Sequence, residues 1–253
     1  MSLSGSRRHQ GGEEGIVDRL ASAPAGKESP AALRRRVAAV ANALQREYGR
    51  PRSHRGKPLD VLVGTILSQN TSDVNSGLAF SRLRERLPTW DQVADADVRT
   101  IEAAIRPGGL SKIKAPRIRR ILRGIRRERG RLALDFLADM TDDEALSYLL
   151  ALPGVGLKTA SVVLLFALDR RVFPVDTHVL RVSRRLQLIG PKTSADRAHA
   201  ELAALIPPRR RHALHLNMIT HGRRICRAGR PDCRHCLLDG AALCPYPRRH
   251  GYT

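Results

Sequence analysis

A single lysine follows a two-glycine turn near the middle of the chain, in the segment Leu152-Pro153-Gly154-Val155-Gly156-Leu157-Lys158-Thr159-Ala160. Two glycines two positions apart allow a tight turn with positive φ angles and no side chains in the way. Backbone N–H groups of Gly154, Val155 and Gly156, with the N-terminus of the next helix, can bind a phosphate. The alternative is a corner that only joins two packed helices. The spacing G-x-x-x-x-G-K-[ST] is absent, which excludes a P-loop.

Lys158 is the candidate nucleophile of this segment. A free lysine titrates near about 10.4, so a nucleophilic lysine needs a pocket that lowers its pKa or a base beside it. Lys158 falls in the first turn of an expected helix, where the positive end of the helix dipole disfavours an ammonium group. Nearby arginines and bound phosphates act on its pKa in opposite directions, so the sequence alone does not give the net shift.

Asp176, eighteen residues after Lys158, is the second candidate for chemistry, in the segment Val175-Asp176-Thr177-His178-Val179. One role for its carboxylate is to assist Lys158. The other is to cap a helix whose inner face carries Val179, Val182 and Leu186. Both roles are compatible with one position, and His178 is interpreted as structural.

All four cysteines fall within 19 residues, at Cys226, Cys233, Cys236 and Cys244. This clustering predicts a metal site rather than the disulfide framework of an exported protein. Four thiolates can hold either zinc or an iron–sulfur cluster, and the ligand type alone does not separate the two. Arginines surround the loop, which predicts that it lies against phosphates: Arg223, Arg224, Arg227, Arg230 and Arg234.

The composition favours a polyanionic partner. The formal net charge is +21, from 45 Lys and Arg against 24 Asp and Glu. Such a charge suits nucleic acid, although an anionic membrane, an acidic protein or an arginine-rich genome also fits it. No apolar run approaches the roughly 18 to 20 residues of a membrane span, and the N-terminus lacks the apolar region of a secretory signal. We therefore expect a soluble, intracellular protein.

The elements that position these residues are expected to be helices throughout. Ser29-Pro30 opens a helix that Gly49 ends. Residues 58–68 are apolar nearly all round, which favours a buried central helix, with a buried strand as the second choice. Further helices are expected at about 73–87, 96–105, 115–129, 142–150, 157–168, 177–187, 195–206 and 210–221. No strand alternation is found, so the fold class is all-α. Residues 1–28 predict a disordered basic tail.

Three of these segments together resemble one known family. LPGVGLKTA is similar to the helix-hairpin-helix of the base-excision DNA glycosylases, and VDTHVLRV is similar to the aspartate motif of that family. The spacing C-x6-C-x2-C resembles the cluster loop of endonuclease III. The last cysteine gap is seven where the family usually has five, a loop insertion of two residues. The resemblance covers about residues 31–246.

The resemblance implies an enzyme acting on double-stranded DNA that carries a damaged base or an abasic site. Lys158 would attack C1′ of the sugar, expel an oxidised pyrimidine and cut the strand by β-elimination through a Schiff base, with Asp176 assisting. The four cysteines would hold a [4Fe–4S] cluster, and the protein would act as a monomer.

The resemblance also implies a set of DNA contacts, because a base must leave the stack before its sugar carbon is reachable. Gln69 or Asn70 would fill the vacated space, and Leu110 would wedge the base step. Lys114 and Arg181 are further expected contacts. The plain alternatives are an amide cap for the first pair and an ordinary loop leucine for Leu110.

Two helical lobes are implied, with the active site in the cleft between them. Residues 58–168 would form a six-helix lobe containing the hairpin. Residues 30–49 and 177–246 would form the second lobe with the cysteine loop, followed by a tail at 247–253. Three other functions remain: a monofunctional mismatch or alkylated-base glycosylase, whose relatives lack the hairpin lysine, a non-catalytic DNA-binding iron–sulfur protein, and a zinc-containing binding module.

Overall fold

The computed structural model describes residues 28–51, 56–247 and Gly251. The expected tails at 1–28 and 247–253 lie almost entirely outside these residues. Within the described ranges every regular element is a helix, which confirms the all-α prediction. None of the helices in these ranges has the length and apolar character needed to cross a membrane.

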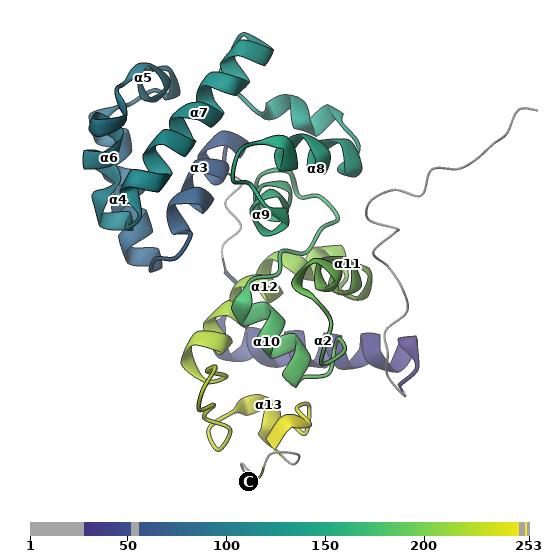
Figure 1. The fold of residues 1–253 in the computed structure, drawn as a ribbon. Coiled ribbons are helices and arrows are strands. Elements are labelled where there is room, and N and C mark those ends of the chain that lie inside the picture. Colours follow the sequence, from purple (N-terminus) through teal and green to yellow (C-terminus); the bar gives the residue numbers. More distant parts are fainter. Residues whose placement is uncertain (1–27, 52–55, 248–250, 252–253) are drawn as a thin grey trace, which may run out of the picture.

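The first lobe holds the helices between residues 58 and 168, in the upper part of Figure 1. These are α3 (Pro58–Ser68), α4 (Asp73–Arg86), α5 (Trp90–Asp95), α6 (Val98–Ile105), η1 (Arg106–Gly108), α7 (Ser111–Arg129), η2 (Asp135–Asp139), α8 (Asp142–Ala151) and α9 (Leu157–Leu168). Helix α5 was not predicted from the sequence, although Thr89 and Gln92 form a capping box at its start. Helix α7 begins four residues earlier than predicted, because Pro116 lies inside that helix rather than in its first turn.

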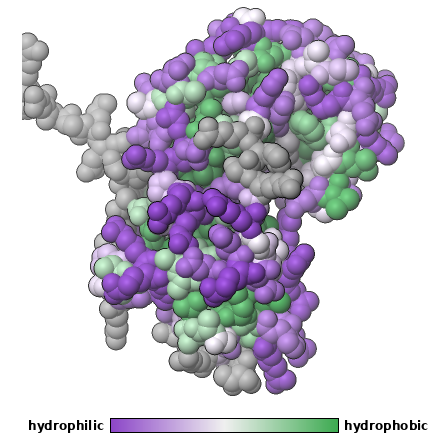
Figure 2. All heavy atoms as spheres, turned by 180° about the vertical axis from the view of Figure 1, so that it is seen from behind, coloured by the Kyte–Doolittle hydropathy of each residue, from purple (hydrophilic) through white to green (hydrophobic). Residues whose placement is uncertain are grey.

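The second lobe combines the N-terminal helix with the C-terminal third of the chain (Figure 1). Its helices are α2 (Pro30–Tyr48), α10 (Thr177–Arg185), α11 (Ala195–Leu205), α12 (Pro208–Arg224) and α13 (Leu237–Gly240). The chain therefore passes between the lobes twice, after α2 and after α9. Figure 2 shows that hydrophilic side chains dominate the rear face of both lobes, with smaller hydrophobic patches between them.

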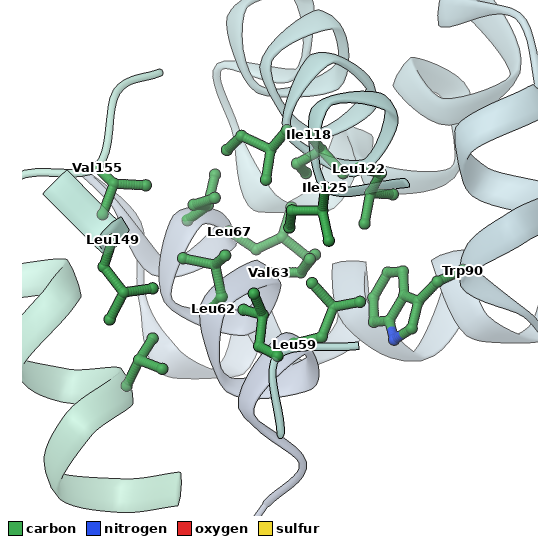
Figure 3. Close-up of a cluster of buried hydrophobic side chains, with 14 of the residues drawn as sticks. Leu59, Leu62, Val63, Leu67, Trp90, Ile118, Leu122, Ile125, Leu149 and Val155 are labelled. Atoms are coloured by element: carbon green, nitrogen blue, oxygen red, sulfur yellow. The ribbon is translucent and has the colours of Figure 1, made fainter. Parts of the chain in front are cut away.

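Helix α3 is the central element of the first lobe. Residues 58–68 are therefore a helix, as predicted, and not the strand that was the second choice. Leu62, Val63, Ile66 and Leu67 are fully buried on it, and Figure 3 shows side chains of α7, α8 and the hairpin turned toward the same cluster. Each such side chain contributes about 1.5–3 kcal/mol of burial free energy. The hairpin that carries Lys158 is thereby packed on a rigid core.

A second hydrophobic cluster holds the other lobe together. It joins an apolar stripe of α2 (Leu33, Val37, Val40 and Leu44) to residues of α10, α11 and α12. Gly222 allows α10 and α12 to approach closely, since a Cβ there would lie 2.9 Å from the Cβ of His178. This contact brings the C-terminal end of α12 beside the segment that carries Asp176.

Candidate active site

The glycine turn joins α8 to α9 and leaves its backbone open to a ligand. Gly154 has a φ of +73° and Val155 is buried, whereas Gly154 and Gly156 are exposed. The N–H of Val155 bonds the carbonyl of Leu152 at 3.1 Å. No side chain caps α9, so the first N–H groups of this 12-residue helix are available to an anion.

Lys158 is the second residue of α9 and lies half-buried between the lobes. Burial lowers its pKa, Asp176 and Asp73 raise it, and Arg223 lowers it again; the net pKa shift is downward. The geometry gives the direction of the net pKa shift, which the sequence alone did not. Desolvation by burial lowers the pKa of Lys158 more than the two neighbouring carboxylates raise it. A larger fraction of neutral amine is therefore present than on a free lysine.

Asp176 comes from the second lobe, at the N-cap of α10. Its Oδ1 accepts a hydrogen bond from the N–H of Val179 at 2.7 Å, so the capping role is present. The same half-buried carboxylate acts on the charge of Lys158 from across the lobes. The structure thus brings together the two residues that the motif spacing selected.

Two buried histidines beneath this site were not found from the sequence. Burial lowers the pKa of both His199 and His215 to about 4, so both rings are neutral at pH 7. The Nδ1–H of His215 donates to the carbonyl of Pro174 at 3.0 Å, two residues before Asp176. His199 lies 3.4 Å from the hydroxyl of Ser161 on α9. They support the segments that carry Asp176 and Lys158.

An ion pair between Asp73 and Arg223 lies next to Lys158. Asp73 is the first residue of α4 and Arg223 belongs to the last turn of α12. The guanidinium hydrogen bonds to both carboxylate oxygens hold the pKa of Asp73 below its usual range. Sequence reasoning missed this pair because 150 residues separate its partners.

The structure distinguishes the two expected gap-filling residues. The amide of Gln69 is bound inside the protein, donating to the Thr159 hydroxyl at 3.3 Å and accepting from Arg117 at 3.1 Å. Asn70 is exposed and holds a φ of +54°. A positive φ is uncommon outside glycine, although asparagine tolerates it best. Asn70 is therefore the residue with a free side chain.

Leu110 is exposed in a strained turn before α7. Its φ is +51°, a left-handed conformation that costs a non-glycine residue of order 1–3 kcal/mol. The side chain is 48% exposed, and Ile113, one turn further, is 54% exposed. Val74 and Leu78 of α4, a helix that packs against the η1 turn before Leu110, are also exposed.

Lys114 is a correction to the expected DNA contacts. Its side chain is 1% exposed, and its ammonium group donates to the carbonyls of Leu67 at 2.7 Å and Gly108 at 2.8 Å. The lysine ties the end of α3 to the turn before Leu110. It therefore supports the Leu110 turn and presents no charge to a ligand.

Arg181 is a second correction. Its guanidinium donates to the carbonyls of Cys226 at 2.9 Å and Gly222 at 2.8 Å, at the C-terminal end of α12. This cation satisfies carbonyl groups that the helix leaves without partners. Arg181 fixes the start of the cysteine loop to α10 instead of reaching outward to phosphates.

The four cysteines line one small cavity in the second lobe, together with Arg185, His221 and Tyr246. The guanidinium of Arg185 donates to Cys226 Sγ at 3.3 Å, and His221 Nε2 lies 3.8 Å from Cys236 Sγ. Burial raises the pKa of the Cys244 thiol to about 11. The loop thus places all four thiols around one space.

Four cysteine thiols can hold either a zinc ion or an iron–sulfur cluster. Within the part of the chain that the structure describes, no three His, Cys, Asp or Glu side chains are arranged to bind one metal ion together. A single zinc ion needs its thiolates at about 2.3 Å. In a cubane iron–sulfur cluster each thiolate binds its own iron, so the four sulfur atoms stand farther apart.

Comparisons with known proteins agree with this arrangement. Residues 63–208 match the family described as HhH-GPD superfamily base excision DNA repair protein. An Arabidopsis thaliana protein named as a DNA glycosylase is 40% identical over 66% of this chain and 57% of its own length. Endonuclease III of Thermotoga maritima is 35% identical over 79% of this chain and 89% of that protein. A solved non-covalent endonuclease III–DNA complex aligns with a TM-score of 0.72 at 26% identity, covering 87% of this chain and 99% of that one.

Proposed function

The chain belongs to the HhH-GPD superfamily of base excision DNA repair proteins and to the endonuclease III family within it, and from this we propose that it is a bifunctional DNA glycosylase and AP lyase. The observation that carries the proposal is Lys158. Its pKa is lowered by burial at the open N-terminus of the hairpin helix, opposite Asp176 of the other lobe. Oxidised pyrimidines in duplex DNA are the proposed substrates.

In the proposed reaction the neutral amine of Lys158 attacks C1′ of the damaged nucleotide. The bond from C1′ to the base breaks, and the base leaves with the electron pair and takes up a proton. Protonation of O4′ opens the sugar ring and leaves an iminium bond between C1′ and the lysine nitrogen. Loss of a proton from C2′ then breaks the C3′–O3′ bond, which releases the 3′ phosphate and cuts the strand.

Asp176 is proposed to act on charge during removal of the base. Its carboxylate stabilises the positive charge that develops on the sugar as the base departs, or accepts a proton from Lys158. The N–H groups of Gly154, Gly156 and the first turn of α9 are proposed to bind a phosphate beside the damaged nucleotide, whereas the Val155 N–H is bonded to Leu152. Asn70 and Leu110 would occupy the duplex after the base has left the stack.

Borohydride trapping on a duplex tests the proposal directly. One duplex carries an abasic site and a second carries thymine glycol. We expect a covalent protein–DNA complex on both, because borohydride reduces the iminium bond to a stable amine. Tight binding without trapping on either duplex would favour a non-catalytic DNA-binding protein.

Leu110→Gly tests the wedge role of Leu110 without lowering the stability of the fold. Glycine adopts the observed positive φ without strain, so the thermal unfolding temperature is expected to stay equal or rise. The rate on duplex thymine glycol is expected to fall by about 10- to 100-fold, since nothing then offsets the unstacking cost of a few kcal/mol. Cleavage of a single-stranded abasic oligonucleotide, which needs no unstacking, serves as the control. Equal losses on the two substrates would contradict the wedge role.

The four cysteines are proposed to hold a [4Fe–4S] cluster, which would fix the arginine-rich loop in place. Their convergence on one cavity and the C-x6-C-x2-C spacing, which resembles the endonuclease III cluster loop, support this cofactor. We expect anaerobically purified protein to be brown and to contain about four irons per chain. Cys233→Ser is expected to lose the colour and iron and to lower the unfolding temperature. A colourless protein with one zinc ion per chain would overturn the assignment.

A further inference from the structure

Within the described residues, the bidentate ion pair between Asp73 and Arg223 connects the two lobes beside Lys158. Both guanidinium terminal nitrogens donate to the carboxylate, one of them over 3.1 Å. Asp73 starts α4 in the first lobe and Arg223 lies in α12 of the second. Both partners act on the charge of Lys158, in opposite directions. The pair therefore stands where the proposed function places the damaged nucleotide.

Solvent reaches this pair, which limits its strength. The side chains are 70% exposed at Asp73 and 44% exposed at Arg223. Exposed ion pairs contribute little to stability, because water and salt screen them. An arrangement of this strength can be broken by a competing ligand without disturbing either hydrophobic cluster.

A DNA phosphate is such a competitor. It offers a guanidinium the same bidentate pair of anionic oxygens that a carboxylate offers. Asp73 is three residues from Asn70, the proposed gap-filling residue, and Arg223 is three residues before Cys226, the first residue of the cysteine loop. The pair thus links the segment that would enter the duplex to the loop that the sequence predicts to lie against phosphates, and its carboxylate repels an approaching phosphate.

We propose that Arg223 exchanges Asp73 for a DNA phosphate when the duplex binds, so that the Asp73–Arg223 pair is a latch: Asp73 occupies Arg223 in the free protein and competes with DNA for it. That the ligand is DNA rests on the proposed function, whereas the exchange of partners at Arg223 goes beyond it. A fixed structural strut is the alternative. In that case the pair would remain intact in the complex.

A double-mutant cycle on DNA affinity separates these two cases. Wild type, Asp73→Asn, Arg223→Gln and the double variant bind a duplex containing tetrahydrofuran, an abasic analogue that cannot form a Schiff base. Fluorescence anisotropy gives Kd at several salt concentrations. We expect Asp73→Asn to tighten binding by roughly two- to fivefold when Arg223 is present, because the competitor is gone.

In the Arg223→Gln background the same change is expected to have a smaller effect, because no guanidinium is left to release. Arg223→Gln alone is expected to weaken binding and to reduce the slope of log Kd against log salt by about one, the signature of one lost phosphate contact. Arg223→Lys keeps the charge without the fork and should retain part of the coupling.

The matched control is Asp95→Asn, which removes the carboxylate of another exposed pair, with Arg126. That pair joins α5 to α7, at the end of the first lobe away from the second lobe in Figure 1. Its loss is expected to leave Kd unchanged. Unfolding temperatures within about 2 °C of wild type show that the variants are folded.

Two results would overturn the latch. Additive effects in the cycle, or weaker binding by Asp73→Asn in the presence of Arg223, would mean that the pair stays closed on DNA. Borohydride trapping of wild type on a natural abasic duplex tests the proposed function separately. If the wild type is trapped but the effects of the two substitutions are additive, only the latch is rejected. If the wild type neither binds DNA nor is trapped, the latch and the proposed function are both rejected.

Discussion

Lys158→Gln is expected to lower cleavage of a duplex abasic site by at least about 1,000-fold and to remove the borohydride-trapped complex. Glutamine fills similar space but has no basic nitrogen, so it cannot form the iminium bond. Single-turnover cleavage on a denaturing gel gives the rate, and the shifted protein band gives the trapped fraction. A wild-type level of trapping in this variant would assign the nucleophile to another amine.

The same substitution is expected to leave the fold intact. Burial lowers the pKa of Lys158, which means that the folded protein disfavours its charged form. A neutral amide removes that cost, so the unfolding temperature is expected to equal or exceed that of wild type. Lys192→Gln is the control, since Lys192 is exposed and lies outside the site; its cleavage rate should not change.

Asp176→Asn is expected to lower the rate of base removal by about 100-fold or more while stability is preserved. Asparagine caps a helix as well as aspartate does, so the bond from the Val179 N–H is retained and only the charge is lost. Asp176→Ala loses the cap as well and should cost about 1 kcal/mol of unfolding free energy. Equal activity in wild type and Asp176→Asn would reduce Asp176 to a capping residue.

The pH profile of Asp176→Asn gives a second readout. The neutral amine is the reactive form, so the rate rises with pH through the pKa of Lys158. The Asp176 carboxylate raises that pKa, and removing its charge therefore lowers it. The acidic limb of the profile is expected to move to lower pH even though the maximal rate falls. An unmoved limb would show that the two groups do not interact.

The sequence by itself determined the local features of this protein. Helical periodicity and caps located most elements, including the start of α2 at Ser29 and the helix predicted at 142–150, which is α8. The hairpin glycines and Lys158 were recognisable because their turn, their helix and their spacing to Asp176 are properties of a short stretch of chain. The cysteine loop was recognisable for the same reason.

Only the tertiary structure decided which charges are available and which are bound internally. Lys114 and Arg181 were expected to contact DNA, yet each is held by backbone carbonyls 41 to 47 residues away, together with nearer carbonyls at Gly108 and Thr177. The direction of the Lys158 pKa shift, the histidines beneath the site and the Asp73–Arg223 pair depend on how the two lobes pack. Side-chain burial and charge pairing between distant segments follow from that packing, and no local pattern along the chain encodes them.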